Sequence, residues 1–591
     1  MQRYFYLCLL LGLAFGLIVN PRAIGAKILY DDFSGNLIDN SKWNENEFVR
    51  EIAGGNLVSK VANNTSTPSA RNYTPFQNPS SINSMECDIN PVVINLDDGT
   101  SNRSFARIGG RFYNTQNSGT QEGDIFASVY IGNRGSGLEA WWGVYESQDE
   151  SGSTWIEIGS NALAVPGLTL GNFYSVKIDY NGTNEFTFTV AGVTESFTGP
   201  LRLSAPFSSY KGLETGAEGS SGNGYISALF DNVLVNNVAY DDFTNAPLNQ
   251  SRWQIYEVIR EIANGRLRLN WQGSDSTSQI SLRLISDDVP YLEAKVRIGS
   301  GSQVSIGATG VARIQGYYYN ESRGPGSGQD YNQYEGDVFA QVRLVLDDNG
   351  DLKANAWVDR SNSDQTNFTT LFSQDFSTLI DFDTDYTLSI EFREPMLIFK
   401  CNDETLLYKI TTPIYTPFGE HRMLRSRLYL DPGESGYIKA QFDDVYVDSE
   451  QAQATYDAAG EWDFSTSNTW VSGGGDCHPD DAHTGTATVT QTGTNVTMVV
   501  HDEGGDTSFD GIISDDTYYL TTSLNEDGGT QTTNVILTLS SKTSGAGKVT
   551  YTWTNGFETC NGGFDIAFAK QAEQPIKSAS MPWIPLLLLD K

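Results

Sequence analysis

The chain has 591 residues, a formal net charge of −35 and a sequence pI near 4.3. Charged residues make up only 19% of it, so the acidity reflects scarce lysine and arginine. Nucleic acid and anionic lipid surfaces are therefore excluded as expected partners, because both are bound through clustered basic side chains. Hydrophobic residues at 39%, aromatic residues at 12% and 58 glycines exclude a disordered chain and favour a turn-rich all-β protein.

Residues 1–26 have the pattern of a secretory signal peptide. Arg3 precedes an apolar run over 7–19, and small residues follow at 25–26. The apolar run is too short to span a membrane comfortably. We therefore predict an exported protein, either secreted or held at the cell surface, with no membrane span in the mature chain.

Two copies of a unit of about 210 residues follow, at 27–237 and 238–450. Five short motifs recur with similar offsets. They are YDDF at 30–33 and 240–243, REIA at 50–53 and 260–263, ARI at 106–108 and 312–314, EGD at 122–124 and 335–337, and FDNV or FDDV at 230–233 and 442–445. Trp43 likewise recurs as Trp253. The length of the unit suits one β-sandwich rather than a solenoid repeat.

Strand signals run through both units. Gly54-Gly55 and Asn264-Gly265 separate apolar runs, as two-residue hairpin turns do. No window shows sustained helical periodicity. We predict an antiparallel sandwich for each unit.

A different β domain is predicted at 456–570, followed by a tail with an apolar end at 571–591. Eight strand-like runs lie at 461–466, 486–492, 496–501, 509–514, 517–524, 530–541, 548–554 and 563–570. Their turn-sized connections favour an up-and-down barrel or a small sandwich. Cys477 and Cys560 bracket the domain and are expected to form a disulfide, whereas Cys87 and Cys401 are expected to be buried free thiols.

The two repeats resemble concanavalin A-like lectin/glucanase jelly rolls, including the laminin-G-like branch. The resemblance is carried by YDDF and Trp43, the hairpin at 50–56 and the closing motif at 230–233, each with its second copy. It implies two tandem jelly-roll sandwiches. Gly460-Glu461-Trp462 similarly resembles the start of a lipocalin-like barrel. The jelly-roll fold hosts both sugar-binding modules and glycoside hydrolases, so the function has to be argued from its sites.

A hydrolase site is not expected in either repeat. The glucanase branch carries Glu-x-Asp-x-x-Glu on one strand, and a retaining mechanism needs two carboxyl groups about 5 Å apart. Both copies of the EGD motif lack the third acid, since Ala127 and Ala340 stand in its place. We therefore predict a protein that is not an enzyme.

Strand alternation instead predicts a sugar-binding face. Ile125, Ala127 and Val129 are expected inside the sandwich, which turns the alternate residues outward. Outward rings beside acids suit stacking on a pyranose, and the alternative is cross-strand packing of an exposed sheet face. The candidate ligand-binding residues are Glu122, Asp124, Phe126, Tyr130, Trp141 and Tyr145 in repeat one, and Glu335, Asp337, Phe339 and Trp357 in repeat two.

A structural Ca²⁺ ion is a further expectation, implied by the resemblance where the first and last strands of a jelly roll meet. The matching acids are Asp32 with Asp231 and Asp242 with Asp443. Carboxylate oxygens suit this cation.

The predicted function is that of an exported, non-catalytic carbohydrate-binding protein whose partner is a glycan or another cell-surface polymer. Two weak sites on one chain would gain avidity. The alternative is a structural or adhesive protein of the cell surface or matrix, and a glycoside hydrolase is a distant third.

Overall fold

The computed structural model describes residues 27–571 with internal gaps, so the proposed signal peptide and residues 572–591 of the tail lie outside the described residues. The gaps fall at 65–66, 96–102, 118, 136, 220–223, 286–288, 322–333, 363–366, 419–420, 450–455, 474–476, 478–481, 503–504, 515, 527 and 556–557. The described part is all-β, with one short 3-10 turn at Pro79–Ser81, which confirms the predicted fold class. Within these residues no helix has the length and apolar character needed to cross a membrane.

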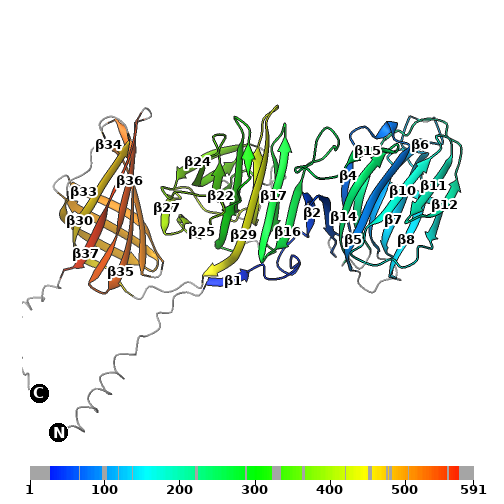
Figure 1. Ribbon diagram of the computed structural model, residues 1–591. Coiled ribbons are helices and arrows are strands. Elements are labelled where there is room, and N and C mark those ends of the chain that lie inside the picture. The colour runs from blue at the N-terminus through cyan, green and yellow to red at the C-terminus, as the bar shows by residue number, and fades with distance from the viewer. Residues whose placement is uncertain are drawn as a thin grey trace, which may run out of the picture.

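Three bodies lie in a row: the first sandwich, the second sandwich and a barrel (Figure 1). Each sandwich has its own six-stranded sheet, and the two sandwiches share one 17-stranded sheet. The six-stranded sheet of the first sandwich has the order β4 (Ser69–Pro75), β13 (Lys211–Glu218), β6 (Arg103–Asn114), β7 (Asp124–Asn133), β8 (Leu138–Ser147) and β9 (Trp155–Leu163). That of the second has the order β18 (Ser278–Arg283), β28 (Arg422–Tyr429), β21 (Thr309–Asn320), β22 (Asp337–Leu346), β23 (Leu352–Ser361) and β24 (Phe368–Asp375).

The shared sheet runs across both sandwiches. Its strands beside the first sandwich core are β2 (Phe48–Ala53), β3 (Asn56–Ala62), β5 (Ser84–Asn95), β10 (Tyr174–Tyr180), β11 (Glu185–Val190), β12 (Val193–Thr198), β14 (Tyr225–Val235) and β15 (Val238–Asp241). Those beside the second are β1 (Lys27–Asp31), β16 (Val258–Ala263), β17 (Arg266–Ser274), β19 (Tyr291–Ile298), β20 (Gln303–Val304), β25 (Tyr386–Arg393), β26 (Met396–Cys401), β27 (Glu404–Lys409) and β29 (Ser435–Ser449).

The two repeats exchange their first segments. Strand β1 pairs with β29 at the end of repeat two, so the blue strand lies against the green body in Figure 1. Strand β15, which opens repeat two in the sequence, pairs with β14 of the first sandwich. Trp43 is accordingly packed in the core of the second sandwich, and Trp253 in the core of the first. The first sandwich is therefore continuous in sequence from β2 onward, whereas the second needs the N-terminal segment of the chain.

Each exchanged segment fits its site in the same way. The indole Nε1 of Trp43 donates to Asp31 Oδ2 at 2.7 Å, and that of Trp253 donates to Asp241 Oδ2 at 2.7 Å. Since the two copies carry the same YDDF and Trp anchors, either could complete either sandwich chemically. Chain connectivity decides which one does, because the β14–β15 turn is short and returns the chain to the first sandwich.

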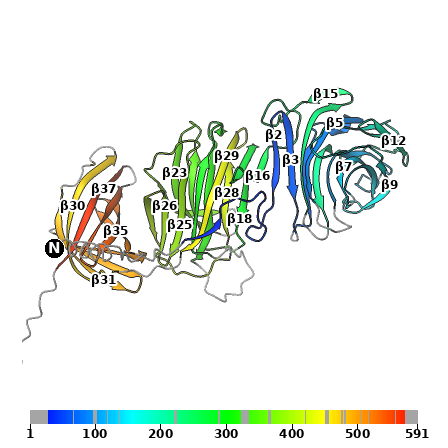
Figure 2. The same cartoon turned by 60° about the horizontal axis from the view of Figure 1, so that its bottom comes forward.

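Strands β2 and β16 join the two halves of the shared sheet by antiparallel pairing centred on Val49 and Ile259 (Figure 2). The predicted hairpins beside this junction are confirmed, since Gly54 and Gly55 have φ of 61° and 75°. The contacts across the junction are nearly symmetric. Glu47 Oε1 accepts from Ile262 N at 3.1 Å, and Glu257 Oε1 accepts from Ile52 N at 2.9 Å.

We expect this junction to weaken as the pH rises from about 4.5 to 8. Glu47 is 3% exposed, and burial raises its pKa to about 8. The folded state therefore holds a proton that the unfolded chain releases near pH 4.3, so this group favours folding at low pH and loses that effect as the pH approaches 8. Urea unfolding at pH 5 and pH 8 should show this slope, and Glu47→Gln should flatten it. The exposed control Glu185→Gln should leave the difference in unfolding free energy between pH 5 and pH 8 unchanged. If Glu47→Gln leaves that difference unchanged as well, the pH dependence does not come from Glu47.

The third body is a closed eight-stranded barrel, and each predicted run lies in one of its strands. These are β30 (Gly460–Gly473), β31 (Thr484–Thr492), β32 (Asn495–Asp502), β33 (Gly505–Ser514), β34 (Thr517–Glu526), β35 (Gly529–Ser541), β36 (Ser544–Thr554) and β37 (Thr559–Lys570). The disulfide between Cys477 and Cys560 is confirmed, as are the buried free thiols Cys87 and Cys401. The similarity of this barrel to lipocalin-like barrels stays a prediction from the sequence.

The outer wall of the barrel packs against the edge of the second sandwich. Met396, Ile398 and Leu407 form a small apolar cluster with Ile512 and Tyr519 of the barrel. At the rim of this contact Lys409 Nζ lies 3.0 Å from Asp510 Oδ2. The contact places the outer strands of the barrel beside β27.

Candidate functional site

A groove of about 690 Å³ lies on the outer face of the six-stranded sheet of the first sandwich. Strand alternation builds it: Ile108 and Val129 enter the core, so their neighbours Arg107 and Tyr130 point the other way. The lining combines four arginines, Arg71, Arg103, Arg107 and Arg111, with the rings of Tyr73, Phe126, Tyr130, Tyr145, Trp155 and Tyr210.

Arg107 is the most deeply placed cation of the groove. It is 4% exposed, and its Nε donates to Glu214 Oε2 at 2.7 Å. Its Nη1 donates to the Tyr130 hydroxyl at 2.7 Å. Burial by itself would lower the pKa of Arg107, but the Glu214 carboxylate holds it well above its usual value. The charge of Arg107 is thus neutralised inside the protein.

The other groove arginines are also anchored from behind. Arg103 Nε donates to Glu218 Oε2 at 2.6 Å, and Arg71 pairs with the same carboxylate. Arg111 bonds Gln121 and lies 3.4 Å from Asp124 Oδ2. Because these carboxylates hold the guanidinium groups in place, the groove keeps fixed N–H donors beside its rings.

The accessible rings meet at one end of the groove. Phe126 and Trp155 are in edge contact with centroids 6.1 Å apart, and the guanidinium of Arg111 lies 5.1 Å from the Trp155 centroid. The Trp155 indole is fixed by an Nε1 hydrogen bond to Gly152 O at 2.8 Å. This end therefore offers a held aromatic platform with neighbouring donors, an arrangement that suits a ring with an apolar face and hydroxyl edges.

Three of the sequence-derived candidates, Phe126, Tyr130 and Tyr145, border this groove, but only Phe126 and Tyr145 keep partial access to solvent, because Tyr130 is 1% exposed and forms the groove floor. Trp141 does not border the groove. It is 2% exposed and stacks on Tyr130 with centroids 4.7 Å apart and an interplanar angle of 6°, beside the Arg134 guanidinium. The prediction that strand alternation presents Trp141 to a ligand is wrong, since its ring packs with these neighbours on the outer face. Trp155 takes the place that Trp141 was expected to have.

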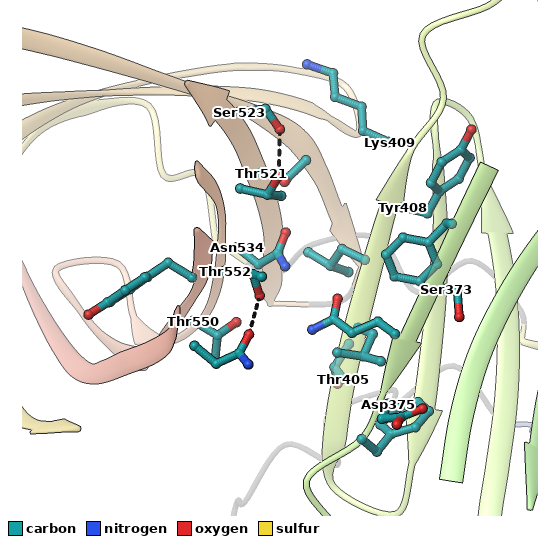
Figure 3. A pocket seen from close by; sticks show the side chains of 18 of the residues that line it. Ser373, Asp375, Thr405, Tyr408, Lys409, Thr521, Ser523, Asn534, Thr550 and Thr552 are labelled. Carbon is teal, nitrogen blue, oxygen red and sulfur yellow. Dashed lines mark hydrogen bonds between the residues drawn. The ribbon is translucent and has the colours of Figure 1, made fainter. Parts of the chain in front are cut away.

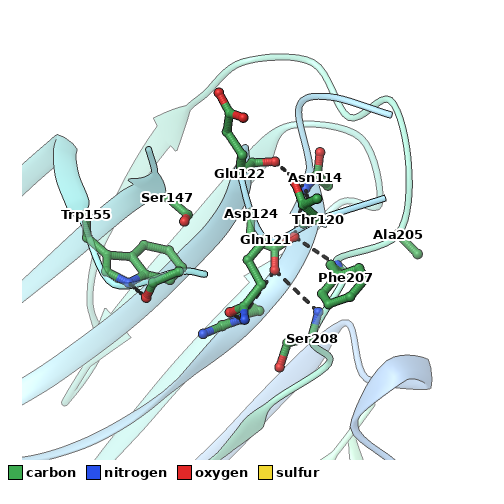
Figure 4. Close-up of polar contacts among 12 residues, drawn as sticks. Asn114, Thr120, Gln121, Glu122, Asp124, Ser147, Trp155, Ala205, Phe207 and Ser208 are labelled. Carbon is green, nitrogen blue, oxygen red and sulfur yellow. Dashed lines mark hydrogen bonds and ion pairs between the residues drawn. The ribbon is translucent and has the colours of Figure 1, made fainter. Parts of the chain in front are cut away.

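The aspartate of each EGD copy holds a loop instead of facing outward, and Figure 4 shows the first copy, with Asp124 bonded to Phe207. Asp124 is 0% exposed and accepts from Asn114 Nδ2 and from Phe207 N, each at 2.9 Å. Asp337 repeats this with Asn320 Nδ2 at 2.8 Å and Phe418 N at 3.0 Å. The expectation that these two aspartates contact a ligand is therefore corrected, because their carboxylates are used by the loop backbone.

Glu122 and Glu335 lie beside these aspartates and do not line the groove. Each of their backbone carbonyls accepts from the side-chain amide of Asn114 or Asn320 at 2.9 Å. In Figure 4 the Glu122 carboxylate points away from Asp124. The recurrence of the motif thus has a structural reason in both sandwiches.

The candidates in the second sandwich divide in the same way. The prediction that Phe339 faces solvent is wrong, because its side chain is 8% exposed and packs against its neighbours. Trp357 is half-buried and lines a cleft of about 1210 Å³ between the second sandwich and the barrel. In Figure 3, Tyr408 and Asp375 face the barrel residues Asn534 and Thr552 across this cleft.

The four proposed calcium ligands are paired differently from the prediction. Asp32 follows β1 and so lies with the second sandwich, whose strand β29 carries Asp443. Asp242 follows β15 in the first sandwich, and burial, with Asp88 and Asp242 nearby, raises the pKa of Asp231. The segment exchange is the physical reason. Among the described residues no cluster of three or more His, Cys, Asp or Glu side chains suits a metal, and Ca²⁺ binding stays a prediction.

The sequence argument missed the groove arginines. The signal was present in the recurring ARI motif, where alternation with the core residue Ile108 turns Arg107 outward. Arg103 lies on the same strand, β6, four residues before Arg107, so the same alternation turns it outward. Arg71 had no comparable pattern, because β4 meets β6 only through β13, which is more than a hundred residues away in the sequence.

No protein-family model matches the sequence, and no curated protein matches it. Similar solved structures include a prokaryotic beta-1,3-1,4-glucanase (lichenase) derived from a mouse hindgut metagenome, at 13% identity and a TM-score of 0.20, covering 32% of this chain and 82% of that one. Domains LG4-5 of the mouse laminin alpha1 chain are 10% identical with a TM-score of 0.22, covering 64% and 83%. The carbohydrate recognition domain of Emp47p is 18% identical with a TM-score of 0.18, covering 31% and 84%. At these TM-scores the likenesses carry no argument about function.

Proposed function

We propose that the protein is an exported, non-catalytic carbohydrate-binding protein that holds a glycan in the groove of the first sandwich. The observation that carries the proposal is the groove lining, which combines fixed aromatic rings with guanidinium donors. A sugar ring stacks on the former and offers hydroxyl oxygens to the latter. The groove volume of about 690 Å³ is in the range of small-molecule and cofactor sites.

The same lining argues against hydrolysis. No carboxylate belongs to the described lining, and the nearby acids Glu214 and Asp124 are bonded to Arg107 and to the loop amides. A retaining or inverting mechanism needs two carboxyl groups facing the scissile bond. Release of reducing sugar from a bound glycan, abolished by Glu122→Gln, would overturn this part of the proposal.

We expect Trp155→Ala to weaken glycan binding about tenfold or more, because the platform contributes most of the apolar contact and stacking on a ring is worth roughly 1–3 kcal/mol. The measurement is a glycan array with the full chain, with and without Ca²⁺, followed by titration of the best glycan. Phe173→Ala is the matched control, since Phe173 is 44% exposed and lies outside the groove. Equal binding by both variants would contradict the site. No binding to any glycan, together with self-association, would favour the structural or adhesive alternative.

A further inference from the structure

Four arginines gather on the outer face of the six-stranded sheet of the second sandwich. Arg313 on β21 stands directly opposite Arg425 on β28 and directly opposite Arg343 on β22. Arg427 lies two residues further along β28, on the same face. Like charges opposite one another destabilise a sheet, so the presence of this row of four arginines calls for an explanation.

Arg313, Arg425 and Arg427 form no ion pair among the described residues, and the only acids that act on the row are Asp359 and Asp375, beside Arg343. Arg313 is 1% exposed and bonds only neutral groups, the Gln341 amide oxygen and the Tyr429 hydroxyl at 3.0 Å. The Nε atoms of Arg313, Arg425 and Arg427 are buried and have no hydrogen-bond acceptor. Buried guanidinium donors without an acceptor are costly, and an anion would satisfy several of them at once.

The nearest acids on this face are already engaged. Asp359 Oδ1 accepts from Trp357 Nε1 at 2.5 Å, and Asp375 accepts from Asn355 Nδ2 at 2.7 Å and from Lys353 Nζ at 2.9 Å. Burial, with Arg313 and Arg427 nearby, lowers the pKa of Arg425 to about 9. Burial raises the pKa of Tyr429, but the charges of Arg313, Arg427 and Arg343 bring it below its ordinary value. The local field is therefore strongly positive in a chain whose net charge is −35.

The first sandwich shows that the fold does not require this row. At the corresponding positions Arg107 stands between Glu214 on β13 and Tyr130 on β7. The first sandwich thus neutralises its central arginine, whereas the second surrounds the equivalent Arg313 with further arginines. The difference lies in side chains alone, which points to a ligand.

One end of the row, at Arg343, borders a space large enough for a chain. Arg343, Asn355 and Trp357 line the cleft of about 1210 Å³ toward the barrel, and the Arg343 guanidinium lies 4.4 Å from the Trp357 ring centroid. The far wall of the cleft carries hydroxyl and amide groups, among them Thr550 and Asn534 (Figure 3). A ligand with anionic groups on a polyhydroxylated chain matches both walls.

We propose that Arg313, Arg343, Arg425 and Arg427 bind the anionic substituent, carboxylate or sulfate ester, of an acidic polysaccharide. The inference rests on the proposed function for the saccharide nature of the ligand, and adds a second site with a defined charge preference. Planar guanidinium groups take carboxylate and sulfate oxygens in pairs, and Arg425 and Arg427 keep partial access to solvent.

The test compares three polymers with one backbone: dextran, carboxymethyl dextran and dextran sulfate. With the full chain in affinity electrophoresis at physiological salt, one or both charged polymers should retard the protein more than dextran does. The double variant Arg425→Gln/Arg427→Gln should weaken that binding about tenfold or more. Lys177→Gln/Lys295→Gln removes the same charge elsewhere and should leave it unchanged. The stronger of the two charged polymers identifies the anion as carboxylate or sulfate.

A second variant separates ligand binding from a structural role. Arg425→Glu installs the carboxylate that the first sandwich has in Glu214. It should abolish binding of the charged polymers and raise the melting temperature of the second sandwich by about 2–6 °C, since it supplies the missing counter-charge. Charged-polymer binding that survives both arginine variants, or that dextran matches, would overturn the inference. Failure of the glycan site proposed in the first-sandwich groove would be detected separately, because that site is tested with Trp155→Ala on the glycan array.

Discussion

A fragment of residues 47–257 is expected to fold into a stable sandwich, whereas a fragment of residues 27–237, which matches the sequence repeat, is expected not to. The first fragment contains β15, Phe243 and Trp253, which complete its core. The second lacks them and instead carries β1 and Trp43, whose place is in the other sandwich. Size-exclusion chromatography and near-ultraviolet circular dichroism of the two fragments test this. A well-folded monomer of 27–237 would contradict the exchange.

Point substitutions check the same exchange in the full chain. Trp43→Ala and Trp253→Ala should each cost about 3–5 kcal/mol, as large buried side chains do. Each substitution should destabilise the sandwich that is built mainly from the other repeat. Hydrogen exchange should rise in strands β16 to β29 for Trp43→Ala, and in strands β2 to β14 for Trp253→Ala. The opposite assignment would show that each repeat completes its own sandwich.

The second large effect is expected for Glu214→Gln, which should destabilise the first sandwich by about 3–5 kcal/mol. The Glu214 side chain is 1% exposed and is the buried counter-charge of Arg107, so its neutralisation leaves a desolvated guanidinium without its paired carboxylate. Urea unfolding of the full chain measures the change. The exposed pair of Glu139 with Arg134 offers the control, since Glu139→Gln should cost less than about 1 kcal/mol.

A double variant tells whether the cost comes from the orphaned charge. Replacing both partners, as Arg107→Met/Glu214→Leu, should recover most of the lost stability, because two apolar side chains leave no buried charge. If the double variant is as unstable as Glu214→Gln alone, the loss comes from altered packing, and the argument for a neutralised pair fails. Conversely, Arg425→Glu is expected to stabilise the second sandwich, because it adds a carboxylate beside arginines that lack a counter-charge.

Local sequence features located the strands well. The eight runs of the last domain lie in eight barrel strands, and Gly54-Gly55 and Asn264-Gly265 form the expected hairpin turns. These features are determined by neighbours in the chain: alternation of apolar residues and the freedom of glycine and asparagine at positive φ. The pairing of Cys477 with Cys560 followed from their place at the two ends of one unit.

The candidate site was only partly accessible to the same reasoning. Alternation correctly turned Phe126, Tyr130 and Tyr145 toward the outer face. It failed for Trp141 and Asp124, because a side chain that leaves the core can still be covered by a neighbouring strand or loop. Whether an outward residue is accessible depends on what lies beside it, and that is not a property of its own strand.

The duplication, the strand positions, the closing disulfide and the acidic composition are all contained in the amino-acid sequence. Tertiary structure decided two further features. It assigned each copy of the YDDF and Trp43 or Trp253 anchors to a core, because the two copies are chemically equivalent and only the short β14–β15 turn distinguishes them. It also gathered Arg313, Arg343 and Arg425 into one row. Their charges are dispersed along an acidic chain and become neighbours only when antiparallel pairing brings distant strands about 5 Å apart.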